Sequence, residues 1–238
     1  MPDSTYPQGT GDKPPDGGQR YTRLPAFRAD SVSREVITDI LNIARRAPSG
    51  VNTQPWNVFL LQGDSRDALV DTARSAVPTL LSDAGTQSRF WNQFRRIPGA
   101  SSWPGPDWQH ATGDFLASAD AAFGGGILHC AADLERYFGL YGAPVALVCT
   151  IDNVLGLGSV LDCGMFLQNI AAAAAERGLS TEVLTGWRGF AANTLAQLEA
   201  PASAMLLAVM AMGHAAPSAV HEGHLQPAPA STITVWHA

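Results

Sequence analysis

The stretch Ala47–Trp56, with the sequence APSGVNTQPW, carries the densest group of side chains able to bind a ligand. Pro48 and Pro55 fix φ near its two ends, so we expect a loop of defined shape. Gly50 lets a ligand approach the backbone closely, and Trp56 could wall the site. Three side chains can both donate and accept hydrogen bonds: Ser49, Asn52 and Gln54. This combination suits an anionic or heteroaromatic ligand whose ring edge alternates N–H and C=O groups.

A second block follows later in the chain. It reads DCGMFLQNI at residues 162–170 and is preceded by GAPV at 142–145 and TID at 150–152. It is followed by GLST at 178–181. The order of the two blocks makes a more specific pattern than either block alone.

Together the blocks resemble the FMN-dependent nitroreductase family, in its nitroaromatic-reducing branch, over roughly residues 26–238. The family hallmark A-P-S-x-x-N-x-Q-P-W matches residues 47–56, and the family helix D-x-G-M-F-L-Q-N matches residues 162–169. The resemblance implies an α+β fold with a mainly antiparallel sheet flanked by helices. It also implies an intertwined homodimer with two sites at the interface and arms exchanged between subunits.

In such an enzyme FMN accepts hydride from NAD(P)H and passes electrons to a small planar acceptor such as a nitroaromatic or a quinone. The resemblance assigns no catalytic side chain and no metal ligand. The turn at Leu184–Gly186 normally meets the flavin near N5 through backbone atoms. The cofactor contacts that the resemblance implies are Pro48, Ser49, Gly50, Asn52, Gln54, Gln168, Leu184, Thr185 and Gly186.

The chain departs from the family in its positive charges. The family grips the FMN phosphate with an R-R-S-x-R-like segment, where this chain offers only Arg23, and with a late R-x-x-R stretch, where it has His224 and Pro227. The only lysine is Lys13, and Arg188 is the last lysine or arginine. Each charge-assisted contact to a phosphate is worth about 1.5–3 kcal/mol, so weak FMN binding is one expectation.

Alternative readings follow from these departures. The first is a flavin-free homologue with the same fold that catalyses a non-redox step, such as a cyclisation, dehydration or isomerisation. A second is a non-enzymatic small-molecule carrier, since no clear acid or base is present. For Asn52 and Gln54, the simpler reading is that their side chains only satisfy backbone groups of the loop.

Hydrophobic periodicity and punctuation predict the elements that position these residues. Ser33 can cap the first helix, and Pro48 ends it. The expected helices are 33–47, 65–76, 127–138, 159–177 and 192–198. The expected strands or extended segments are 57–62, 144–152, 180–185 and 204–212.

Composition divides the chain into a polar tail at residues 1–19 and one domain at 20–238, which ends in an extended arm at 214–238. Residues 78–126 form an aromatic-rich insert of poor periodicity, as expected of a lid, although such aromatics often only anchor a loop to the core. The tryptophans expected to cover a substrate are Trp91, Trp103 and Trp108.

The composition and net charge limit the kinds of partner that we expect. Hydrophobic residues are 46% and charged ones 15%, which favours a subunit interface and hence a homodimer. A net charge of −6 without a basic stripe argues against nucleic acid. Three cysteines at wide spacing are expected to be buried free thiols. We see no signal peptide and no apolar run of membrane-spanning length, and we therefore expect a cytoplasmic protein without a membrane partner.

Overall fold

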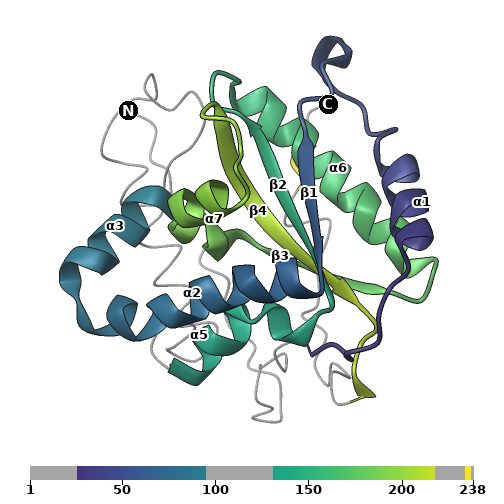
Figure 1. Ribbon diagram of the computed structural model, residues 1–238. Helices are drawn as coiled ribbons and strands as arrows, with labels where there is room; N and C mark the ends of the chain where they lie inside the picture. Colours follow the sequence, from purple (N-terminus) through teal and green to yellow (C-terminus); the bar gives the residue numbers. More distant parts are fainter. Residues whose placement is uncertain (1–25, 95–130, 218–233, 237–238) are drawn as a thin grey trace.

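The computed structural model describes residues 26–94, 131–217 and 234–236 (Figure 1). Its centre is a four-stranded sheet in the order β1-β2-β4-β3, in which every neighbouring pair is antiparallel. The strands are β1 (Asn57–Gln62), β2 (Val145–Asp152), β3 (Ser180–Leu184) and β4 (Ala204–Gly213). The predicted antiparallel α+β architecture is confirmed, and each strand lies within a residue or two of its expected bounds.

The central strands β2 and β4 are covered on both faces of the sheet. All residues of β2 from Val145 to Ile151 are buried, and β4 is buried from Ala208 onward. Their pairing runs from Val145 opposite Met212 to Asp152 opposite Ala204, with an irregularity between Cys149 and Thr150. Continuous apolar runs of this kind are what a strand buried on both faces requires.

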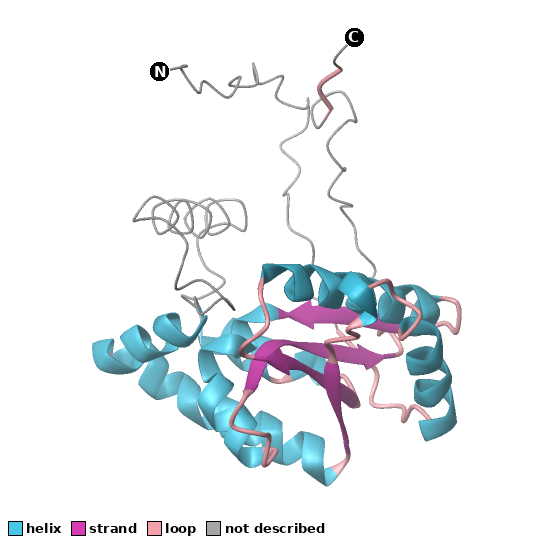
Figure 2. Ribbon diagram, turned by 90° about the horizontal axis from the view of Figure 1, so that it is seen from above, coloured by secondary structure: helices cyan, strands magenta, loops and turns pink. Residues whose placement is uncertain are grey.

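Helices cover the two faces of this sheet (Figures 1 and 2). The α-helices are α1 (Arg34–Ala44), α2 (Asp64–Ser82), α3 (Ala84–Phe94), α5 (Ala131–Phe138), α6 (Leu157–Ala175) and α7 (Ala191–Gln197). The helices α1 and α6 contribute to a smaller hydrophobic cluster on one face, and α2, α3 and α5 contribute to a larger cluster on the other. Side chains of β2 alternate between the two clusters, as the pleat of a strand demands. Short 3₁₀ turns are η1 (Gly50–Asn52), η3 (Leu140–Gly142) and η4 (Thr185–Phe190).

The first helix forms for the expected reasons. Ser33 is its N-cap, and the Ser33 Oγ accepts the N–H of Val36 at 3.3 Å. Ile37, Ile40 and Ala44 lie one helical turn or so apart and are all buried in the smaller cluster. The helix ends at Ala44, three residues before its predicted end, and the candidate loop follows Arg45 and Arg46.

The helix α2 runs six residues further than its predicted end near Ala76 and encloses Pro78. Val77 and Leu80 continue the stripe of buried residues begun by Leu69 and Val70, so burial of this face keeps the chain helical. The predicted end near Ala76 is therefore wrong.

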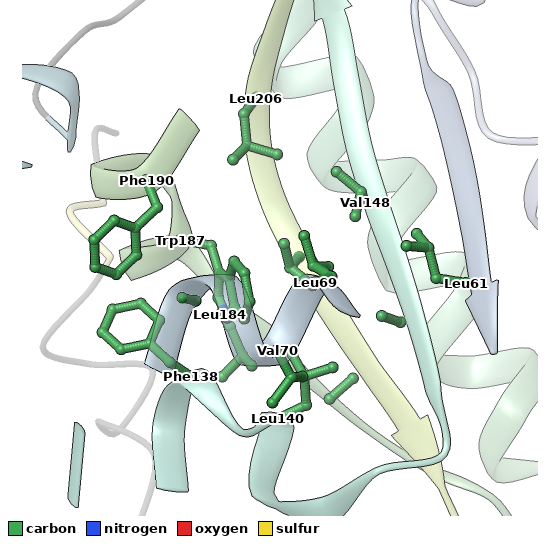
Figure 3. Close-up of a cluster of buried hydrophobic side chains, with 14 of the residues drawn as sticks. Leu61, Leu69, Val70, Phe138, Leu140, Val148, Leu184, Trp187, Phe190 and Leu206 are labelled. Atoms are coloured by element: carbon green, nitrogen blue, oxygen red, sulfur yellow. The ribbon is translucent and has the colours of Figure 1, made fainter. Parts of the chain in front are cut away.

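The described part of the expected insert, residues 78–94, is therefore helical. Phe90 of α3 is buried in the larger cluster, where its ring packs edge-on against Phe138 and Phe190. Trp187 lies in the same cluster, fully buried against Phe138 (Figure 3). The first part of this segment thus belongs to the core, and residues 95–126 lie outside the described chain.

The packing of this aromatic cluster yields a first prediction. A Cβ at Gly189 would lie 2.0 Å from a ring carbon of Phe90, so Gly189→Ala must displace a packed ring. We expect the free energy of unfolding to fall by about 1–3 kcal/mol or more, measured by chemical denaturation. Gly158→Ala is the control, because no atom lies within 4 Å of its added Cβ. Equal stability of the two variants would contradict the packing.

Candidate functional site

The loop after α1 is held by hydrogen bonds within itself. The Ser49 carbonyl accepts the N–H of Asn52, and the Ser49 Oγ accepts the N–H of Gln54, both at 3.0 Å. The carbonyl of Gly50 accepts both the N–H and the Oγ1–H of Thr53, again at 3.0 Å. The hydroxyls of a serine and a threonine therefore bind backbone groups of the loop.

The side chains of Asn52 and Gln54 are exposed and do not take part in this network. Within residues 26–94, 131–217 and 234–236, neither side-chain amide makes a hydrogen bond. The reading in which these amides only satisfy the loop backbone therefore does not describe the structure, since Ser49 and Thr53 serve that purpose. Both amides remain available to a ligand.

The loop backbone is strained at residues other than glycine. Val51, Asn52 and Gln54 have φ of 46°, 59° and 47°, in the left-handed region that costs roughly 1–3 kcal/mol for a residue with a Cβ. Gly50 does not have a positive φ, and a Cβ there would meet only Asp162 Oδ2 at 3.9 Å. The left-handed conformations begin one residue after the glycine, at Val51. The role of Gly50 in admitting a ligand stays a prediction.

The second sequence block packs directly against this loop. The N–H of Gly50 donates to Asp162 Oδ2 at 3.1 Å. Further along α6, the ring of Phe166 stacks on Trp56 with centroids 4.8 Å apart and planes 4° apart. The Asn169 Nδ2 donates to the carbonyl of Ala44 at 3.5 Å. One face of Trp56 is thus taken up by the core and cannot wall a site.

Of the remaining predicted contacts, Pro48 lies exposed at the start of the loop and Gln168 lies exposed on α6. Since η1 contacts α6, the loop residues Pro48, Ser49, Gly50, Asn52 and Gln54 and the helix that carries Gln168 lie on the face of the sheet covered by α1 and α6. We call these six residues the loop half-site. Its polar side chains can hydrogen-bond the edge of a planar ring.

The turn at Leu184–Gly186 lies elsewhere. Leu184 is fully buried in the larger cluster, on the opposite face of the sheet, while Thr185 is exposed. The N–H of Gly186 donates to Tyr137 Oη at 2.7 Å, and a Cβ on Gly186 would lie 2.8 Å from that oxygen. We call Leu184, Thr185 and Gly186 the turn half-site. Because an added Cβ would clash with the phenol oxygen, only a glycine at position 186 allows Tyr137 to lie this close to the backbone.

The expected residues therefore form two half-sites on opposite faces of one sheet (Figure 1). The loop half-site packs with the smaller cluster and the turn half-site with the larger one. Sequence reasoning missed Tyr137, for which no motif gives a signal. It also gave no role to Asp162, although this residue stands in the family pattern.

The predicted cations and aromatics are only partly described. Arg23, His224, Pro227, Trp103 and Trp108 lie outside the described residues. Arg188 stands on η4, two residues after Gly186, and burial lowers the pKa of its guanidinium. Trp91 lies on α3, which packs against η4, and Gln93 of the same helix accepts the N–H of Ala192 at 2.8 Å.

Comparisons with known proteins agree with this architecture. The profile of the nitroreductase family matches residues 19–214. The chain is 32% identical to a nitrobenzene nitroreductase of Ectopseudomonas oleovorans, covering 79% of this chain and 81% of the relative. It is 30% identical, with the same coverage, to a chloronitrobenzene nitroreductase of Comamonas testosteroni.

A solved structure shares the fold. The FMN-dependent nitroreductase NfnB from Mycobacterium smegmatis, in complex with NADPH, aligns over 90% of this chain and 93% of its own with a TM-score of 0.69 at 23% identity. Fold and relatives together define a flavin oxidoreductase enzyme. The chain belongs to the nitroreductase family.

The Tyr137–Gly186 contact yields a second prediction. Tyr137→Phe leaves the Gly186 N–H unpaired, so the free energy of unfolding should fall by about 1–3 kcal/mol in chemical denaturation at neutral pH. Burial raises the pKa of the Tyr137 phenol, so the folded state favours the neutral form. The contribution of the neutral phenol to the free energy of unfolding is fully present below the ordinary phenol pKa of about 10, and it is lost as the pH rises above that value.

The variant lacks this titration, so its stability should decline less steeply than that of the wild type in alkaline solution. Identical alkaline slopes for the two proteins would show that the phenol is not held in its neutral form.

Proposed function

We propose that this protein is an FMN-dependent NAD(P)H oxidoreductase that reduces the nitro group of small planar aromatic compounds. Its relatives include a nitrobenzene nitroreductase and a chloronitrobenzene nitroreductase, which supports this substrate class. Structural neighbours of the same fold are FMN- and NADPH-dependent nitroreductases. No nucleic acid partner is proposed, and we infer a cytoplasmic location.

The observation that carries the proposal is the loop half-site. Hydrogen bonds of Ser49 and Thr53 hold its backbone in a strained conformation. The side-chain amides of Asn52 and Gln54 make no hydrogen bond to this backbone within the described residues. Each amide can present both a donor and an acceptor to a ring edge. The residues present therefore fit a flavin ring. When bound, FMN supplies the hydride chemistry, and the chain supplies binding and orientation.

We further propose that the active form is a homodimer. The loop and turn half-sites lie on opposite faces of the sheet, so one chain cannot apply both to the same ring. A second copy can supply the missing half, which places two sites at the interface. In this arrangement a ring rests between the loop of one subunit and the turn of the other.

Exposed apolar residues mark the surface available for this contact. Leu157 and Leu161 on α6 are 52% and 69% exposed, and Val51 at the tip of the contacting turn is 98% exposed. Among the described helices, α6 is the one long and apolar enough to cross a membrane by length and composition. In our proposal its exposed leucines are covered by the partner subunit instead.

Arg188 is our candidate for the charge that a reduced flavin requires. It follows the turn half-site by two residues and remains a cation at neutral pH even with its pKa lowered by burial. A guanidinium near the N1 and O2 edge would stabilise negative charge there. Arg23, the sequence candidate for a phosphate contact, lies outside the described residues.

A third prediction tests the cofactor. Purified protein should be yellow, or become so on reconstitution, with one FMN per subunit. Asn52→Gly removes the side-chain amide, is compatible with the left-handed φ of 59°, and should weaken FMN binding by about 3- to 10-fold in fluorescence titration. Asn153→Gly, the same change at an exposed turn position, is the matched control.

The rate of nitrobenzene reduction by NADPH or NADH should rise in proportion to the amount of bound flavin. A colourless protein that cannot be reconstituted would favour the flavin-free homologue, and the missing arginines would then be the reason.

A fourth prediction tests the dimer. Leu161→Glu places a charge in the proposed interface, where burial without a partner is costly. We expect a shift from dimer to monomer by analytical ultracentrifugation, together with loss of FMN. Ala196→Glu adds the same charge at an exposed position of α7 and should leave the dimer intact. A dimer that persists in Leu161→Glu would place the interface elsewhere.

A further inference from the structure

Among the described residues, Asp162 is the buried carboxylate. Its exposure is 9%, and the surrounding positions on α6 include the buried Cys163 and Phe166. Carboxylates are seldom buried unless they accept hydrogen bonds, because desolvation of the charge is costly. The position of Asp162 therefore calls for a partner that needs an acceptor.

That partner is the backbone of the loop half-site. The N–H of Gly50 donates to Asp162 Oδ2 at 3.1 Å across a separation of 112 residues in sequence. Its acceptor is a carboxylate, which as an anion accepts in charge-assisted bonds, whereas the acceptors of the bonds inside the loop are neutral oxygens. The bonds of Ser49 and Thr53 join the loop to itself, whereas this bond joins it to α6.

The loop requires such an external tie. Val51, Asn52 and Gln54 hold left-handed conformations that persist only where the surrounding structure determines them. Val51 is almost fully exposed, so its side chain has no packing to offset its strain. The tie at Gly50 acts immediately before the strained residues, where it limits how far they can relax.

Three contacts to this region come from one stripe of α6. Asp162, Phe166 and Asn169 stand at positions i, i+4 and i+7, so they project from the same side of the helix. They contact Gly50, the ring of Trp56 and the carbonyl of Ala44, respectively. Phe166 and Asn169 fix the ends of the loop, and Asp162 fixes its tip.

We propose that Asp162 is a positioning residue, which holds the tip of the loop so that the amides of Asn52 and Gln54 face a ligand. The tie itself is independent of any ligand. Its consequence for FMN rests on the proposed function. The test therefore has one arm without the cofactor and one with it.

The first arm measures amide hydrogen exchange of the cofactor-free protein over residues 48–56. Asp162→Ala removes the acceptor and should speed exchange at Gly50 by about 10- to 100-fold, because the amide is protected by a charge-assisted bond. Asp162→Asn keeps an oxygen acceptor without the charge and should speed exchange less, by about 3- to 10-fold.

Asp152→Ala is the matched control. The Asp152 Oδ1 accepts the N–H of Val154 at 3.0 Å in a local turn, so its loss should leave Gly50 unchanged. Should Asp162→Ala fail to fold, Asp162→Asn carries the test. Unchanged exchange at Gly50 in a folded Asp162 variant would overturn the proposal.

The second arm measures FMN affinity by fluorescence titration. We expect the dissociation constant to rise about 10-fold or more in Asp162→Ala and to be largely restored in Asp162→Asn, since the role is exerted through the hydrogen bond. Faster exchange with undiminished FMN affinity would overturn the positioning role toward the ligand. If exchange at Gly50 is faster in the Asp162 variants but the wild type binds no FMN, the proposed function is refuted and the tie stands.

Discussion

The pairing of β2 with β4 is the constraint on which the rest of the structure depends. Both strands are covered on both faces, so the sheet they form separates two hydrophobic clusters. Each cluster anchors one half-site: α1 and α6 carry the loop, and α5 and η4 carry the turn. A sheet with both faces buried thus places the two half-sites on opposite faces. The proposed requirement for a second subunit follows from this separation.

The loop half-site shows how a strained conformation is maintained. The left-handed residues are stabilised by short bonds from Ser49 and Thr53 and by one longer-range bond from Asp162. Small polar side chains near in sequence define the shape, and a buried acid distant in sequence defines its placement. Because these other groups hold the loop, the longer amides of Asn52 and Gln54 are not needed for its hydrogen bonds and are available to a ligand.

The sequence predicted the strands well, because apolar runs such as Val145–Ile151 permit few other structures. Helix ends were less accurate, since the continued burial of Val77 and Leu80 outweighed the proline between them. The motif supplied the half-site residues as candidates, but their distribution over two faces depends on side-chain alternation along β2 and on helix placement, which no local pattern encodes. The contacts of Asp162 and Tyr137 likewise join segments 112 and 49 residues apart.

The phenol of Tyr137 has a consequence for any molecule that approaches the Gly186 amide. Because that N–H already donates to Tyr137 Oη, an incoming acceptor exchanges one hydrogen bond for another and gains only the difference between them. The displaced hydroxyl must also find a new donor or return to water. Selectivity at this amide is therefore comparative: weak acceptors leave the tyrosine in place, and only an acceptor stronger than a neutral phenol oxygen takes its position.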